Sequence, residues 1–292
     1  MKNLYHLVRE LKPLEFNEEK IDSHILAYNL EKVKNFIPNY LITKYFTELN
    51  DVQRGYTLVN NLLEEHDFMH FKDEEVKLFL TAFCSLFATP IKVIDALGLW
   101  IKIDINLNNE MNRAGGDGYL PLHNDLVNTR NPPDNVALFC FKPDPLGGGA
   151  TIISNIQNAL GLATEKFGMR IKEMMFTEGK YFGLKGVGEE LNPFPLVEKI
   201  SDHRSRYRFT SRLLDLIVDK SSLEYEVIEF INETLLSAAT KIMLKRGDLI
   251  LLNQNIVVHG RTSVGSNQLD LEYVNRRVIY QMFLRTNASS KI

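Results

Sequence analysis

The chain has 292 residues, of which 45% are hydrophobic, 24% charged and 10% aromatic, a composition that excludes a disordered, collagen-like or disulfide-scaffold protein. The 34 Lys and Arg residues nearly balance the 37 Asp and Glu residues, so the charge does not support a nucleic-acid or membrane partner. The longest uncharged apolar-rich run, residues 78–91, is too short for a transmembrane helix, and the first residues lack a signal-peptide core. With Cys84 and Cys140 far apart in the chain, we expect buried thiols in a cytoplasmic protein.

The first hundred residues read mostly as helix. Asp73 can cap a helix whose apolar residues recur every three or four positions until Pro90. From residue 101, short β-rich runs are separated by Gly, Pro and Asn, which favours an antiparallel sandwich or barrel. Residues 156–244 read as an insertion between barrel strands, with a helix opened by the capping box Ser221-x-x-Glu224. We therefore predict one domain over residues 1–292, mainly β with helical additions, with strands at 101–106, 119–122, 136–141, 151–154, 249–252 and 278–284.

A His-x-Asp pair is the first candidate for chemistry. Side chains alternate faces along an extended strand, so His123 and Asp125 are expected to point the same way. A His near an Asp is by itself more often a hydrogen-bonded pair than a metal site. A second candidate, His259, follows the Gly247-Asp248 turn and an apolar run. Two His and one carboxylate on a β scaffold match the facial triad of non-haem Fe(II) enzymes.

The order and spacing of these motifs, over residues 99–285, resemble the taurine dioxygenase and clavaminate synthase-like family of Fe(II)/2-oxoglutarate-dependent oxygenases. The resemblance implies a double-stranded β-helix, the jelly-roll core of cupin-like proteins, with N-terminal helices and a lid made by the insertion. It also implies that His123, Asp125 and His259 bind Fe(II), with 2-oxoglutarate and O2 as cosubstrates.

The resemblance further implies which residues bind 2-oxoglutarate. A Gly-rich turn, Gly147-Gly-Gly-Ala-Thr151, ends in a hydroxyl that would bond the distal carboxylate. Arg277 would form the salt bridge, since a guanidinium holds a carboxylate bidentately. The long spacing after His259 leaves Arg276 as the alternative. Four residues after Arg277, where many relatives have another Arg, this chain has Gln281.

Substrate contacts are expected in two polar segments. Asn106, with other polar residues up to position 113, lies where amino-acid hydroxylases of this family often contact substrate. Arg208 and Arg212 belong to a local basic run, and Gln281 is a further candidate; solvated surface is the alternative interpretation for both segments. Relatives that act on basic amino acids tend to have Asp where this chain has Thr210. We therefore expect a small polar, amino-acid-like substrate without a strongly cationic side chain.

The implied reaction is hydroxylation of an unactivated C–H bond with release of succinate and CO2, by a monomer or homodimer. Asp125 disfavours halogenation, whereas desaturation and cyclisation stay open. A Jumonji-type protein hydroxylase or demethylase shares the triad but usually binds 2-oxoglutarate through a Lys. A zinc hydrolase and a non-catalytic cupin-like metal-binding module are the remaining alternatives.

Overall fold

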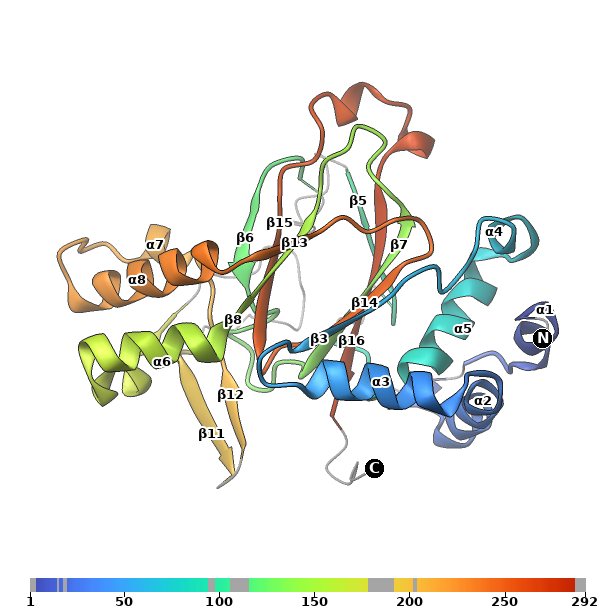
Figure 1. Cartoon of the computed structure of the whole chain (residues 1–292), viewed down its shortest axis with the longest axis horizontal. Helices are drawn as coiled ribbons and strands as arrows, with labels where there is room; N and C mark the ends of the chain where they lie inside the picture. The colour runs from blue at the N-terminus through green and yellow to red at the C-terminus, as the bar shows by residue number, and fades with distance from the viewer. Residues whose placement is uncertain are drawn as a thin grey trace.

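Two larger antiparallel sheets form the centre of the computed structural model, which describes residues 4–14, 16–17, 20–93, 98–105, 116–177, 192–201 and 204–286 (Figure 1). The six-stranded sheet has the order β3-β14-β7-β16-β4, and β5 also pairs with β16. The four-stranded sheet has the order β13-β8-β15-β6. The strands of the first sheet are β3 (Tyr56–Val59), β4 (Thr89–Ile91), β5 (Ile101–Asp104), β7 (Asn135–Lys142), β14 (Leu249–Asn253) and β16 (Val278–Arg285). Those of the second are β6 (Leu120–His123), β8 (Thr151–Asn155), β13 (Thr240–Ile242) and β15 (Val257–Arg261).

Both faces of the six-stranded sheet are buried, which explains why its central strands read as continuous apolar runs. Ala137, Phe139, Tyr280 and Met282 pack into one hydrophobic cluster with the N-terminal helices. The residues between them on the same strands, such as Leu138 and Ile279, belong to another cluster that includes Ile153 and Val257 of the second sheet. One hydrophobic core therefore lies outside the sheet and one lies between the two sheets.

The N-terminal helices cover the outer face of the six-stranded sheet (Figure 1). Their bounds are α1 (Leu4–Glu10), α2 (Ser23–Phe36), α3 (Asn39–Asn50), α4 (Asp67–His70) and α5 (Asp73–Cys84). The prediction that Asp73 caps its helix is wrong, because the N-cap is Lys72, whose amide donates to the Glu75 carboxylate at 2.8 Å. Asp73 instead starts the helix, accepting a hydrogen bond from Tyr280 at 2.8 Å and pairing with Lys77 at 2.7 Å. The segment also supplies β3 and β4 to the sheet.

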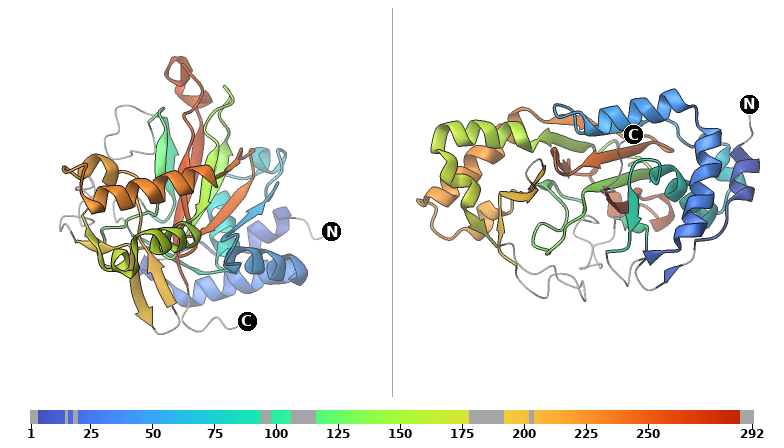
Figure 2. Two further views of the ribbon diagram at one scale, coloured as in Figure 1. Left: turned by 60° about the vertical axis from the view of Figure 1, so that its left-hand side comes forward. Right: turned by 90° about the horizontal axis from the view of Figure 1, so that it is seen from below.

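The predicted insertion packs on the outer face of the four-stranded sheet. It contains α6 (Ile156–Phe167), α7 (Leu213–Leu216), α8 (Leu223–Ser237), the 3-10 helix η3 (Met169–Glu173), the antiparallel strand pair β9 (Met175–Phe176) and β10 (Phe194–Pro195), and the hairpin of β11 (Val197–Ser201) and β12 (Arg204–Tyr207). Figure 2 shows this group and the N-terminal helices at opposite ends of the molecule.

Two details of the insertion differ from the prediction. Ser222 rather than Ser221 caps α8, because its hydroxyl accepts from the Tyr225 amide at 3.2 Å, whereas the Ser221 hydroxyl donates to Asp219. The segment that contains β13 pairs with β8, so the last part of the predicted insertion is a strand of the sheet. Within the described residues, no helix is long and apolar enough to cross a membrane.

Candidate metal centre

His123 and His259 lie opposite each other on neighbouring strands. They are register partners in the β6–β15 pair, with ring centroids 4.7 Å apart. Their sequence neighbours Leu122 and Val258 pack against the insertion, so alternation turns both imidazoles toward the space between the sheets. The register shifts beyond His259, where a side chain at Gly260 would come within 2.6 Å of the Leu120 carbonyl oxygen. Glycine therefore permits the close approach of the two strands beside the imidazoles.

Asp125 reaches the two imidazoles from a turn rather than from a strand. Strand β6 ends at His123, and Leu126 has the left-handed φ of 56°, so the predicted extended His-x-Asp geometry is wrong. The carboxylate still approaches both rings, with Oδ2 at 3.5 Å from His259 Nε2 and Oδ1 at 3.8 Å from His123 Nε2. The turn is held by Gln254, whose side-chain oxygen accepts from the Asp125 amide at 2.5 Å.

Asn124 braces this turn from the side opposite to the imidazoles. Its buried amide donates to the carbonyls of Gln254 at 2.9 Å and Val257 at 3.1 Å. Its carbonyl oxygen accepts from the Phe209 amide at 3.0 Å. Asn124 thus joins the turn to two distant parts of the chain, the connection before β15 and the segment after β12.

The donor set fits a divalent transition-metal ion. One ligand-type atom from each of His123, Asp125 and His259 lies within 4.8 Å of the others. His123 Nδ1 is 2.8 Å from the Pro121 carbonyl, which assigns the proton to Nδ1 and leaves a lone pair on Nε2. Burial lowers the pKa of His259 to about 4, so this ring is neutral near pH 7. Asp125 Oδ2 is buried and has no hydrogen-bond partner among the described residues, and a buried carboxylate oxygen without a donor suits a cation.

A cavity of about 70 Å³ adjoins the three residues, and its lining includes Thr151, Arg261, Arg277 and Gln281. The Arg277 side chain is buried, and it makes no hydrogen bond or ion pair within the part of the chain that the structure describes. Burial, with the nearby Arg261 guanidinium, lowers the pKa of Arg277 to about 10, so it stays cationic at neutral pH. The cavity therefore presents a buried cation that calls for an anionic ligand.

The Gly-rich turn makes room for this guanidinium. Gly149 has a φ of 73°, and a Cβ on it would lie 2.9 Å from Arg277 Nε. The Asp144 carboxylate holds the turn by accepting from the amides of Gly148 at 2.9 Å and Gly265 at 2.6 Å. Glycine at position 149 is thus required twice, for the backbone conformation and for the space beside Arg277.

The two arginines that the sequence left as alternatives have different surroundings. Arg276 is not among the cavity-lining residues, and its guanidinium donates to three backbone carbonyls, those of Leu271, Ile105 and Leu269, at 3.1, 3.2 and 2.8 Å. Arg277 faces the cavity together with Thr151. This placement favours Arg277 over Arg276 as the anion-binding residue.

The predicted substrate residues are not all near the cavity. Arg208 binds Glu198 at 2.6 Å and the carbonyls of Val127 and Thr129 at 2.9 Å each, so its donors tie the β11–β12 hairpin to the chain after Asp125. Arg212 precedes α7 and does not line the cavity.

Gln281 does line the cavity, and its amide donates to Asp125 Oδ1 at 3.2 Å. Asn106 lies outside the described residues. The sequence analysis missed Gln254, because its contact with Asp125 depends on a turn that no local sequence motif predicts.

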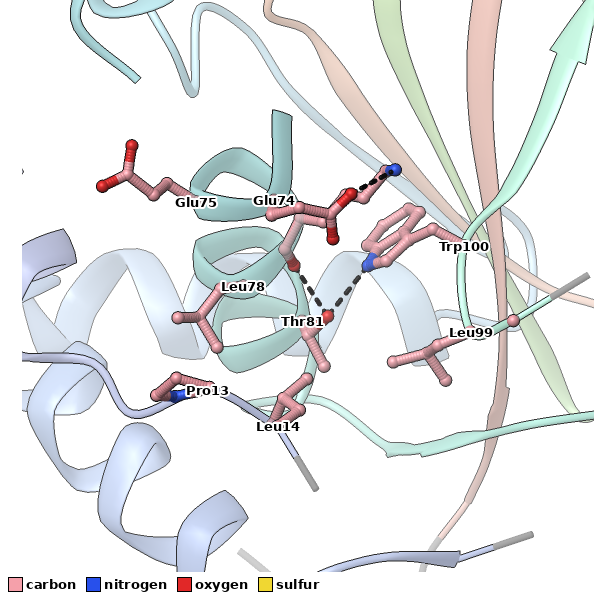
Figure 3. A pocket seen from close by; sticks show the side chains of 10 residues that line it. Pro13, Leu14, Glu74, Glu75, Leu78, Thr81, Leu99 and Trp100 are labelled. Carbon is pink, nitrogen blue, oxygen red and sulfur yellow. Dashed lines mark hydrogen bonds and ion pairs between the residues drawn. The ribbon is translucent and has the colours of Figure 1, made fainter. Parts of the chain in front are cut away.

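A larger groove of about 460 Å³ lies between α5 and the N-terminal segment (Figure 3). Its walls include Leu14, Leu78, Leu99 and Trp100, and the Trp100 indole donates to Thr81 at 2.8 Å. It shares no lining residue with the smaller cavity. The groove also has Glu74, Glu75 and Lys77 in its walls, but the cluster of His and Asp residues found among the described residues as able to hold a metal ion lines the smaller cavity.

Comparisons with known proteins agree with this geometry. The profile of the family described as "Taurine catabolism dioxygenase TauD, TfdA family" matches residues 43–276. No curated protein sequence matches the chain.

Among solved structures, the chain is similar to an asparagine oxygenase in complex with Fe(II), 2S,3S-3-hydroxyasparagine and succinate (TM-score 0.71, 14% identity, 97% of this chain and 89% of that one). It is also similar to the non-heme iron oxygenase OrfP in complex with Fe, succinate and (3S)-hydroxy-L-Arg (TM-score 0.62, 13% identity, 97% and 86%). A further similar structure is OrfP with Fe and alpha-ketoglutaric acid (TM-score 0.61, 14% identity, 97% and 85%).

The likeness in fold extends over nearly the whole chain, and the family match covers most of it. The His-Asp-His cluster lies on the two paired strands and the turn described above. The chain belongs to the TauD/TfdA family and is an Fe(II)/2-oxoglutarate-dependent dioxygenase.

Proposed function

We propose that this dioxygenase hydroxylates an unactivated C–H bond of a small polar, amino-acid-like metabolite, releasing succinate and CO2. In this proposal His123, Asp125 and His259 hold the Fe(II), and the two sheets form a double-stranded β-helix around it within a single domain. When bound, Fe(II) and 2-oxoglutarate supply the oxidative chemistry, in which one oxygen atom of O2 enters the substrate and the other enters succinate.

The observation that carries the proposal is the buried Arg277 guanidinium, which makes no direct salt bridge within the described residues and has the Asp144 carboxylate only as a more distant charge. A dicarboxylate cosubstrate would supply that counter-ion, and its distal carboxylate would accept a pair of parallel hydrogen bonds from the guanidinium. Thr151 lines the same cavity, so its hydroxyl is available to the same carboxylate. We assign the Arg277 and Thr151 end of the cavity to 2-oxoglutarate.

The backbone positions of the three expected ligand residues are fixed, which supports the metal assignment. Two of the three residues lie on paired strands in direct register, and the third is held at its backbone by Gln254. A site on strands keeps its geometry better than one on loops, so little reorganisation is needed when the metal binds. The burial of the His259 and Asp125 atoms also excludes water from one side of the site.

The substrate class rests on two kinds of support. The similar solved structures contain hydroxylated asparagine in one case and hydroxylated arginine in the other. In this chain, Thr210 is buried and its backbone forms an isolated antiparallel β-bridge with His123, so a residue with a neutral hydroxyl rather than a carboxylate lies next to the metal-binding strand. We therefore expect neutral polar amino acids or their derivatives to be better substrates than free Arg or Lys.

Anaerobic titration of the metal-free protein with Fe(II), and then with 2-oxoglutarate, tests the cofactor assignments. We expect a visible metal-to-ligand charge-transfer band that is lost in His259→Ala and needs higher 2-oxoglutarate concentrations in Arg277→Ala. Arg276→Ala is the matched control and should titrate like the wild type. Absence of the band in the wild-type protein would refute the assignments of metal and cosubstrate residues.

A screen of amino acids for succinate release above the uncoupled background tests the substrate class. Mass spectrometry should show a product heavier than the substrate by one oxygen atom. If only free Arg or Lys supported turnover, the expectation of a neutral substrate would be wrong. If no small molecule did so while a peptide did, the proposal of a metabolite hydroxylase would fail.

A further inference from the structure

Gln281 is held rigidly next to the carboxylate of Asp125. It lies on β16, where its backbone is in register with Leu138 of β7 on one side and Ile101 of β5 on the other. Its side chain is buried and donates from Nε2 to Asp125 Oδ1 at 3.2 Å. The opposite amide orientation would place two acceptor oxygens against each other, so the nitrogen must face the carboxylate.

The two oxygens of the Asp125 carboxylate therefore differ. Oδ1 accepts the hydrogen bond from Gln281. Oδ2 is buried, accepts no hydrogen bond from the part of the chain that the structure describes, and lies 3.5 Å from His259 Nε2. Among the contacts of these described residues, Oδ2 is thus the oxygen that keeps all its lone pairs for a cation.

We propose that Gln281 is a positioning residue that holds Asp125 Oδ1, so that Asp125 binds the metal through Oδ2 alone; this inference rests on the proposed function. Carboxylates bind metals through one oxygen or through both. A second oxygen on the metal would occupy a position that 2-oxoglutarate or O2 needs, since the triad leaves three open. Gln281 thus keeps that position free.

The choice of an amide has a physical reason. The neutral amide of Gln281 donates to Asp125 Oδ1 and so orients the carboxylate without forming an ion pair with it. The sequence suggested that Gln281 contacts the substrate. In the structure the amide group of Gln281 donates to Asp125 instead.

Metal binding by variants of Gln281 tests the proposal without turnover. Gln281→Met keeps the length of the side chain but removes the donor. Gln281→Asn keeps the amide but is too short to reach Oδ1. The matched control is Met282→Leu, because Met282 is the next residue of β16 and packs on the opposite face of the sheet. Co(II) affinity is measured by calorimetry and Co(II) coordination by visible absorption, after the thermal midpoint of each variant has been checked.

We expect both Gln281 variants to bind Co(II) roughly tenfold or more weakly than wild type, as is typical when a partner of a metal ligand is lost. Their Co(II) bands should also shift as a second carboxylate oxygen replaces another ligand, whereas the bands of Met282→Leu should match those of wild type. Wild-type affinity and bands in both variants would overturn the positioning role. Failure of wild type itself to bind Co(II) would instead refute the metal site, and the positioning role with it.

Discussion

At the scale of single residues, Arg277 combines a role in binding with a cost in stability. A buried cation that makes no direct salt bridge within the described residues opposes folding until an anion binds. We expect Arg277→Met to raise the thermal midpoint of the ligand-free protein by about 2–4 °C, which corresponds to roughly 1 kcal/mol. The same variant should lose the stabilisation that 2-oxoglutarate gives to the metal-loaded wild type. Differential scanning fluorimetry with and without the cosubstrate measures both effects.

Arg276→Met is the control for this prediction. Its guanidinium donates to three carbonyls, so its removal should lower the midpoint of the ligand-free protein. A lower midpoint for Arg277→Met as well would mean that Arg277 has a stabilising partner in the ligand-free protein.

Alanine variants of two glycines in the same turn distinguish the effect of backbone strain from the effect of steric crowding at the site. Gly147 and Gly149 both have left-handed conformations, with φ of 80° and 73°. A Cβ on Gly147 would meet nothing within 4 Å, whereas one on Gly149 would lie 2.9 Å from Arg277 Nε. Gly147→Ala and Gly149→Ala should therefore each lose about 1 kcal/mol of stability.

Only Gly149→Ala should also weaken 2-oxoglutarate binding, by roughly tenfold, because the guanidinium must shift. Titration of the charge-transfer band in both variants measures the effect. Equal cosubstrate affinities in the two variants would contradict the role that we give to Gly149.

At the scale of elements, the β11–β12 hairpin is joined to the chain after Asp125 by the buried Arg208, which the half-buried Glu198 carboxylate holds in place. The Glu198 carboxylate binds Arg208 at 2.6 Å and Arg206 at 3.4 Å. Removing its charge leaves a buried guanidinium without its anionic partner, so Glu198→Gln should lower the free energy of unfolding by about 3 kcal/mol.

Urea denaturation measures this loss, and Glu226→Gln is the control. Glu226 and Lys166 form an exposed pair at 4.0 Å, whose loss should cost less than about 1 kcal/mol. Similar losses in the two variants would show that the Glu198 cluster contributes no more than a surface ion pair.

Most of the core strands could be predicted because they are apolar runs bounded by Gly, Pro or Asn. Strands β7, β14 and β16 lie within two residues of the expected bounds. Strand β13 has mostly exposed polar residues and exists because β8 pairs with it, so periodicity could not reveal it. Strands β3 and β4 also depend on pairing with distant strands.

The candidate site could be predicted in part. The triad residues are expected from the order of the motifs, whereas the family resemblance leaves Arg276 as an alternative to Arg277; the structure brings the triad and Arg277 to one cavity. The turn at Asp125 could not be foreseen, because Leu126 has a left-handed conformation that its side chain disfavours. Contacts such as that between Asn124 and Gln254, 130 residues apart, arise only from the tertiary fold.

At the scale of the whole molecule, the metal centre lies between separate hydrophobic clusters. One cluster joins the N-terminal helices to the outer face of the large sheet, and another holds the insertion against the small sheet. Metal binding should slow amide hydrogen exchange in β6 and β15, which carry His123 and His259. It should leave α2 and α3 unchanged, since they contribute no residue to the cavity.

Exchange mass spectrometry with and without Co(II) measures this pattern, and His259→Ala provides the control that should show no metal effect. Equal protection of α2, α3 and the two strands would contradict local stabilisation and would indicate that the whole chain unfolds as one unit during exchange.

Because His123 and His259 are direct register partners, metal binding depends on the correct alignment of β6 and β15. A slip of one residue turns every side chain of a strand to the other face, so a misaligned β15 would direct His259 into the apolar insertion. Only correctly aligned chains then present both imidazoles to one ion. A metal ion present during refolding therefore binds and stabilises the chains with the correct register. Chains with a shifted register do not bind it and can still rearrange. We therefore expect the metal ion also to favour the correct alignment of β6 and β15 during folding.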